Sequence, residues 1–182
     1  MINNRFHKGG GYRPKEEFSE RVLDLRRVTR VVAGGKRFRF RATVIIGNEK
    51  GMVGVGVAKG LDVASAVGKA KAAAKKDIIR VPLKNRTIPH EVYAKYSAAR
   101  VLIKPTAEGN GLKAGGSVRA VLALAGVKDA TAKCLGRTSN KLTNALATIE
   151  ALKGLRAEMP ARASIKHAPT PKESVPGHET VK

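Results

Sequence analysis

Seven basic residues between positions 26 and 41 have only neutral residues among them, and they offer the clearest chemistry in the chain. They are Arg26, Arg27, Arg30, Lys36, Arg37, Arg39 and Arg41. A guanidinium group can bind a phosphate through two parallel hydrogen bonds. A solvated protein surface usually mixes charges of both signs, whereas this stretch carries only one. The stretch therefore predicts a surface that contacts a nucleic acid through its phosphates.

Two strands joined by a tight turn are expected to carry these cations. Residues 22–33 and 36–47 are rich in β-branched and aromatic side chains. Gly34 and Gly35 between them can supply the positive φ that a tight turn needs. Because side chains alternate along a strand, the second strand should place its arginines on one face and Phe38 on the other. We predict that one face of this sheet meets anions and the other meets a core.

A third strand over residues 52–58 and a helix over residues 62–80 are predicted next. Gly54 and Gly56 lie on one face of the strand, which indicates that another element approaches closely there. Asp62 is a suitable N-cap for the helix. Helical spacing predicts a buried stripe of Val63, Val67, Ala70, Ala74 and Ile78. The order of three strands and a helix predicts an antiparallel sheet covered on one face.

The second half of the chain alternates strands and helices. We expect a strand within residues 93–105, a helix over 117–125 that Gly126 ends, a strand over 129–135 and a last helix capped by Ser139. This order predicts a β-α-β-α unit.

The fold class is therefore predicted to be α+β, with two small domains and an extension at each end. The predicted boundaries are a basic N-terminal extension over residues 1–19, a first domain over 20–84, a second domain over 85–157 and a flexible Pro-rich tail over 158–182. The N-terminal extension could order on an acidic polymer or stay disordered.

The composition favours an anionic partner. Lys and Arg exceed Asp and Glu so far that the formal net charge is +22, which opposes compaction unless an anion neutralises it. Nucleic acid is the leading candidate, and an anionic membrane surface is the alternative. A membrane role lacks support, because no long basic amphipathic helix and no apolar run of bilayer length is evident. The single cysteine, Cys134, excludes an internal disulfide and suits a reducing compartment, so a cytoplasmic location is expected.

Two glycine-rich stretches could belong to phosphate sites. Residues 54–60 precede a helix, but their spacing is one residue too long for a dinucleotide fingerprint. Residues 109–117 also open a helix, but the lysine of a nucleotide-binding loop is missing after Gly116. That loop could still bind a phosphate or carboxylate through its backbone N–H groups, or it could be only a tight turn. No carboxylate pair or metal spacing is present, so we expect no enzyme activity, metal or cofactor.

Six motifs in a fixed order carry a family resemblance. They are residues 35–42 (GKRFRFRA), 46–48, 51–56, 105–109, 114–122 and 125–129. Together they resemble the bacterial small-subunit ribosomal protein S5 family over about residues 20–155. The resemblance implies a first domain similar to double-stranded-RNA-binding domains, with a three-stranded antiparallel sheet plus a helix. It implies a second domain of the type shared with ribonuclease P protein and elongation-factor G domain four.

The resemblance also implies a function and a set of site residues. Members are structural constituents of the small (30S) subunit that bind 16S rRNA, support assembly and decoding accuracy, and lie near the channel through which mRNA enters. The loop over residues 29–36 would reach the rRNA beside the spectinomycin site, although members often carry Lys where this chain has Ala33. The candidate RNA-binding residues are Arg26, Arg27, Thr29, Arg30, Gly34, Gly35, Lys36, Arg37, Arg39, Arg41 and Lys59.

Protein partners follow from the same resemblance. The candidate interface with small-subunit protein four consists of Gly109, Gly111, Gly115, Gly116 and Arg119, and small-subunit protein eight is a further expected partner. No homo-oligomer is expected. The alternative function is that of a free-standing RNA chaperone or RNA-processing accessory factor. The lack of a helix-turn-helix, zinc-finger or basic-zipper signature favours RNA over DNA in either case.

Overall fold

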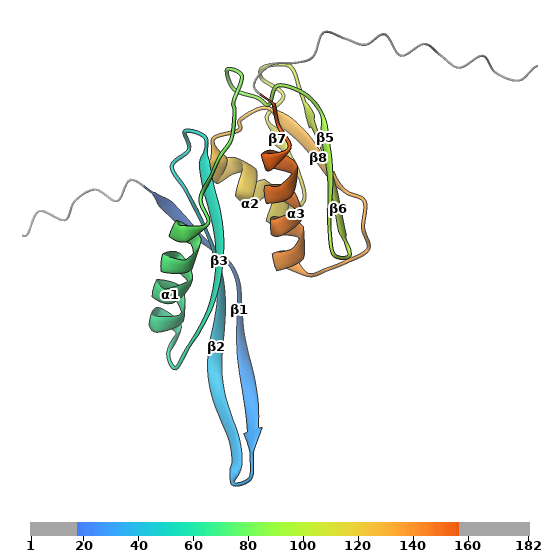
Figure 1. Cartoon of the computed structure of the whole chain (residues 1–182). Helices are drawn as coiled ribbons and strands as arrows, with labels where there is room; N and C mark the ends of the chain where they lie inside the picture. The colour runs from blue at the N-terminus through green and yellow to red at the C-terminus, as the bar shows by residue number, and fades with distance from the viewer. Residues whose placement is uncertain (1–17, 157–182) are drawn as a thin grey trace, which may run out of the picture.

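The computed structural model of the protein describes residues 18–156, which form two sheets and three helices (Figure 1). The first sheet has the order β1-β2-β3-β4, and the second has the order β5-β6-β8-β7. The elements of the first half are β1 (Ser19–Val32), β2 (Gly35–Gly47), β3 (Met52–Gly60), α1 (Val63–Lys76) and β4 (Ile79–Arg80). Those of the second half are β5 (Val92–Tyr96), β6 (Ala99–Pro105), β7 (Leu112–Lys113), α2 (Gly116–Ala125), β8 (Ala130–Cys134) and α3 (Lys141–Lys153).

The α+β class is confirmed, with an antiparallel sheet and helix followed by a mixed sheet with two helices. Of the extension predicted over residues 1–19, residues 1–17 lie outside the described residues, and Ser19 already begins β1. The tail predicted over residues 158–182 lies outside the described residues.

Helix α1 lies directly on β3 because both elements carry small residues where they meet. Gly54, Gly56 and Gly60 face the helix, and a Cβ atom placed on Gly54 would come within 2.5 Å of the Ala74 carbonyl oxygen. The helix presents a stripe of fully buried alanines: Ala66, Ala70 and Ala74. The close approach predicted at Gly54 and Gly56 is therefore confirmed, and it is an approach of backbone to backbone.

The predicted helix is too long at its C-terminal end. It ends at Lys76, with Asp77 as its C-cap, and residues 79–80 form β4 instead. Helical periodicity continues into Ile78, but residues 79–80 pair instead with Met52 and Val53 of β3. Asp62 occupies the N-cap position as predicted, but its side chain makes no capping hydrogen bond.

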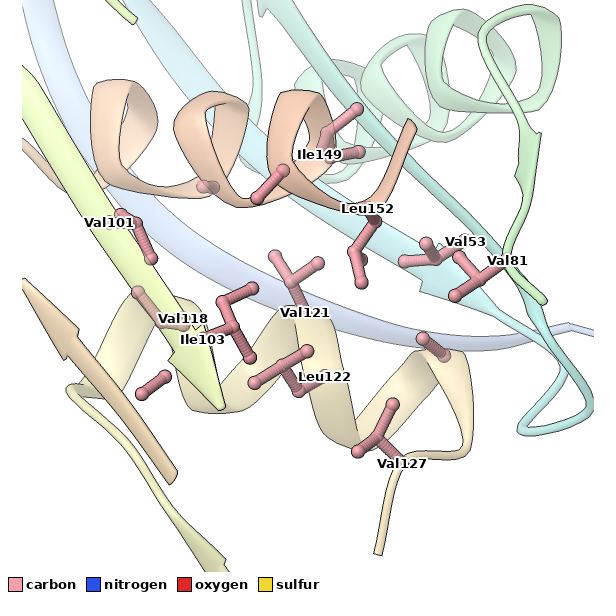
Figure 2. Packing of buried hydrophobic residues seen from close by; sticks show 14 of the residues in the cluster. Val53, Val81, Val101, Ile103, Val118, Val121, Leu122, Val127, Ile149 and Leu152 are labelled. Atoms are coloured by element: carbon pink, nitrogen blue, oxygen red, sulfur yellow. The ribbon is translucent and has the colours of Figure 1, made fainter. Parts of the chain in front are cut away.

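The other face of the first sheet packs on the second domain. Val53 and Val81 belong to one buried cluster with Val121 of α2 and Leu152 of α3 (Figure 2). Helices α2 and α3 thus lie between the two sheets (Figure 1). The first sheet is therefore covered on both faces at this end, whereas the sequence predicted cover on one face only.

Backbone contacts fix the β2–β3 turn against the end of α2. The Glu49 N–H donates to the Leu124 carbonyl at 3.0 Å, and the Gly51 N–H donates to the Ala125 carbonyl at 2.9 Å. A Cβ atom on Gly47 would overlap the Leu124 carbonyl group. Position 47 therefore has no room for a side chain while these contacts exist.

Three details of the second half differ from the predictions. The strand predicted within residues 93–105 is a hairpin, β5 and β6, that turns at Ser97 with a positive φ of 53°. Strand β7 lies inside the predicted glycine loop. The N-cap of α3 is Asn140 and not Ser139, since the Asn140 Oδ1 accepts a hydrogen bond from the Leu142 N–H at 3.1 Å. Gly126 ends α2 in the left-handed conformation, with φ of 92°, as predicted.

Gly47→Ala should destabilise the protein, because the new methyl group would push the β2–β3 turn away from α2. Overpacking of this kind costs about 1–3 kcal/mol. The measurement is the urea midpoint of unfolding. Gly68→Ala is the matched control, since position 68 lies on α1 with no atom within 4 Å of the added Cβ. Alanine is the better helix former by about 1 kcal/mol, so this variant should gain stability. Equal midpoints for Gly47→Ala and wild type would contradict the contact.

Candidate nucleic-acid interface

The β1–β2 hairpin extends past α1 and the second domain as a two-stranded arm, which we define as residues 25–40 (Figure 1). No residue of the arm is buried. Strand β3 pairs with β2 only from Phe40 toward Gly47, so the outer part of the arm lacks a third strand. The prediction that one face of this sheet meets a core is therefore wrong for the arm, where Phe38 is 47% exposed. Phe40, at the base, is half-buried against the alanine stripe of α1.

One face of the arm and its base carries most of the predicted cations. The strand register places Arg26 opposite Arg41, Arg30 opposite Arg37, and Arg41 also opposite Lys59 of β3. We call this surface the arginine face, and it consists of Arg26, Val28, Arg30, Arg37, Arg39, Arg41 and Lys59. Like charges opposite one another on a sheet repel. A polyanion seated on this face would relieve that repulsion.

An open cleft of about 380 Å³ lies on the arginine face. Its lining includes Arg30, Arg37, Arg39 and Lys59, with the apolar Val28 among them. Within residues 18–156, the one ion pair of this face joins Arg26 to Asp24 at 2.7 Å. The remaining cations are thus available to an external anion.

Three predicted site residues point to the opposite face of the arm. Arg27 is opposite Phe40, Thr29 is opposite Phe38, and Lys36 is opposite Val31 on the same face. The Arg27 guanidinium lies 4.6 Å from the centre of the Phe38 ring, which is cation–π geometry. This face also exposes Val31, so it combines apolar surface with charge.

The turn at the tip uses its two glycines differently. Ala33 and Gly34 form the turn, and Gly35 pairs with Val32 as the first residue of β2. The positive φ predicted for this turn is found at Gly35, with a value of 134°, and not at Gly34. Only position 35 therefore demands glycine for its backbone conformation.

Asp129 organises the glycine loop between β6 and α2, a role that the sequence did not predict. Its Oδ1 accepts hydrogen bonds from the N–H groups of Gly111 at 2.9 Å and Gly109 at 3.2 Å. Its Oδ2 lies 3.3 Å from the Nε atom of Arg86. The available signal in the sequence was an acidic residue at the start of a predicted strand in a strongly basic chain. Because these two N–H groups already donate to the protein's own carboxylate, they are not free to bind a phosphate.

The candidate protein-interface residues lie on the loop between β6 and α2 and on the first turn of α2. Gly115 is the N-cap of α2, and its carbonyl accepts the Arg119 N–H at 2.7 Å. Gly109, Gly115, Gly116 and Arg119 are exposed, and Gly111 is half-buried. Gly109 and Gly111 lie beside Asp129 at the start of β8, whereas a Cβ atom on Gly115 would lie 3.3 Å from the Cys134 Sγ at the end of that strand. Their role in a protein interface stays a prediction.

Other reactive groups are sparse in the described part of the chain. Within residues 18–156, no three His, Cys, Asp or Glu side chains lie close enough together to hold a metal ion. Burial raises the pKa of the Cys134 thiol, while the charge of Lys133 opposes that rise. Cys134 packs against the buried cluster, as predicted. No described helix is both long enough and apolar enough to cross a bilayer.

Comparison with known proteins gives one consistent family. Residues 18–82 match the sequence model of the ribosomal protein S5 N-terminal domain, and residues 94–162 match that of the S5 C-terminal domain. The small ribosomal subunit protein uS5 of Thermosynechococcus vestitus is 54% identical over 141 residues, which cover 77% of this chain and 80% of that protein. The protein uS5c of Guillardia theta is 53% identical over 158 residues, covering 86% and 92% of the two chains. The uS5 of Thermotoga neapolitana is 50% identical over 140 residues, covering 77% and 78%.

Gly35→Ala should loosen the arm, because an L-residue at positive φ is strained by about 1 kcal/mol or more. The arm has no core to hold it, so the strain should appear as local opening. We expect amide hydrogen exchange along residues 28–39 to become about fivefold faster or more. Gly34→Ala is the matched control, since position 34 lacks positive φ and has no atom within 4 Å of the added Cβ. Equal exchange in the two variants would contradict the assignment.

Asp129→Ala should release the glycine loop and lower the free energy of unfolding. Hydrogen bonds to a charged group contribute about 1.5–3 kcal/mol each, so a loss of about 3 kcal/mol is expected. Urea unfolding and the exchange rates of the Gly109 and Gly111 amides measure the two effects. Asp129→Asn keeps an acceptor oxygen but removes the charge beside Arg86, and its loss should be smaller. Unchanged exchange at Gly109 and Gly111 in the Ala variant would refute the role of the carboxylate.

Proposed function

Because this chain belongs to the ribosomal protein S5 family, and is therefore a structural constituent of the small ribosomal subunit, we propose that its arm binds 16S rRNA. The observation that carries the proposal is the arginine face, which offers six cations, of which only Arg26 has a carboxylate partner, Asp24, within residues 18–156. Guanidinium and ammonium groups spaced along two strands can neutralise successive phosphates. The contacts fix position on the RNA and do not read its sequence.

The shape of the arm supports insertion between RNA segments. It projects without a core of its own, and both of its faces carry cations. A two-stranded ribbon alone is marginally stable in water. A partner that binds only the ordered arm would stabilise it by mass action. The family comprises structural components rather than enzymes, which agrees with a docking role for these residues.

The second domain is proposed to hold protein neighbours. We propose that the glycine loop and Arg119 contact small-subunit protein four, with protein eight as a further neighbour. The loop is exposed but tied down by Asp129, which suits a preformed contact surface. In this arrangement the protein supports subunit assembly, lies near the channel through which mRNA enters and influences decoding accuracy in the cytoplasm. We propose that the two domains span residues 20–84 and 85–157.

The triple variant Arg37→Ala, Arg39→Ala and Arg41→Ala should bind 16S rRNA with a weaker salt dependence. Each lost phosphate contact lowers the slope of log affinity against log salt by about 0.7–0.9, so a fall of roughly 2–3 is expected. The same variant should leave small subunits during a high-salt wash, whereas the wild type should sediment with them in a sucrose gradient.

A charge-matched control comes from α1. The variant Lys69→Ala, Lys75→Ala and Lys76→Ala removes the same charge from exposed positions away from the arginine face. This control variant should keep most of the salt dependence of 16S rRNA binding, and it should stay associated with small subunits. An unchanged slope in the arginine variant would overturn the assignment of the arm. Release of the wild type by the wash would instead favour a free-standing RNA chaperone.

A further inference from the structure

Within residues 18–156, no helix covers the outer face of the second sheet. Helices α2 and α3 pack on its inner face, where Val101 and Ile103 of β6 are fully buried (Figure 1). Burial alternates along β6, along β8 and over residues 92–95 of β5, so the more exposed residues there face outward. In Figure 1 no helix lies beyond β5, β6 and β8 on that side. A sheet face this open is available to a partner.

Charge on this outer face is almost entirely of one sign. Its cations are Lys95, Arg100, Lys104, Lys113 and Lys133. Lys95 and Arg100 stand directly opposite each other, an arrangement that is repulsive without an anion between them. Within residues 18–156, the single ion pair on the face joins Lys104 to Glu91 at 3.2 Å. The face is therefore complementary to a polyanion.

An aromatic residue lies among these cations. Tyr93 of β5 is opposite Leu102 of β6, which is opposite Lys133 of β8. The Tyr93 side chain is 54% exposed. A tyrosine ring on an open sheet surrounded by cations can stack with a base while its neighbours hold the phosphates. Bases in a duplex are already stacked, so the arrangement favours unpaired RNA.

A cleft at one end of the outer face offers a second place where a phosphate could bind. It measures about 390 Å³ and is lined by Lys95, Arg100 and Arg137, with Leu135 as an apolar wall. The Leu135 N–H donates to the Arg100 carbonyl at 2.8 Å, which continues the sheet pairing past β8 and fixes this wall. Three cations thus converge at the β5–β6 turn.

We propose that the outer face of the second sheet binds single-stranded RNA, with Tyr93 stacking on a base and Lys95, Arg100 and Lys133 contacting phosphates. This surface lies in the other domain from the arginine face and uses none of the residues assigned above to 16S rRNA or protein four. It goes beyond the proposed function, since it gives the protein a second RNA contact of a different kind.

The experiment uses the full chain and a fluorescent single-stranded RNA of mixed sequence, about ten nucleotides long, to match the usual site size. Tyr93→Ala should weaken binding by about fivefold to a hundredfold, the range for loss of one stacked base. Tyr93→Phe keeps the ring and should bind like the wild type. The variant Lys95→Ala, Arg100→Ala and Lys133→Ala should lower the salt slope by about 2, at about 0.7 per contact to a single strand.

Two controls separate this proposal from the function proposed for the arm. In the variant Arg37→Ala, Arg39→Ala and Arg41→Ala, the additional effect of Tyr93→Ala should persist. The α1 variant Lys69→Ala, Lys75→Ala and Lys76→Ala removes an equal charge, and an equal loss of affinity in it would show a non-specific charge effect and contradict the proposal. Unchanged affinity in Tyr93→Ala and in the Lys95, Arg100 and Lys133 variant would overturn the proposal and indicate a protein partner for this face. Either result leaves the assignment of the arm standing.

Discussion

Burial of the first sheet on both faces at one end is the constraint on which the rest of the structure depends. On one face the alanines of α1 lie against the glycines of β3, and on the other α2 and α3 complete a shared core. Both contacts are close enough to exclude side chains, at Gly56 and at Gly47. Since interiors pack densely, these contacts set the position of the second domain relative to the first sheet.

The arm follows from this constraint. Strands β1 and β2 are longer than the buried end requires, so residues 25–40 continue outward without a core. Charge can accumulate there because every side chain of the arm keeps contact with water. The same density of Arg at the buried end would leave unpaired charges in an apolar interior. The protein can therefore present a dense cationic surface because these strands extend beyond the core into solvent.

In this protein the glycine-rich segments allow close packing of the backbone and bind one of the protein's own carboxylates. Gly54 and Gly56 resemble part of a dinucleotide motif, but they provide room for the backbone of α1. Gly109 and Gly111 resemble part of a phosphate loop, but their amides bind the carboxylate of Asp129. In both places glycine permits a close backbone approach, and the group that approaches belongs to the protein itself.

Local periodicity and the order of the motifs were enough to predict the α+β class, the strand pairing around residues 33–36, the close approach at Gly54 and the family. The sequence also concentrated the cations between positions 26 and 41. Where the sheet stops being covered depends on tertiary contacts, so the exposure of Phe38 could not be predicted from the sequence. The end of α1 and the role of Asp129 were likewise set by partners 18 or more residues away in the chain. Local patterns report what a segment can form, whereas burial and hydrogen-bond partners depend on which distant segments meet it.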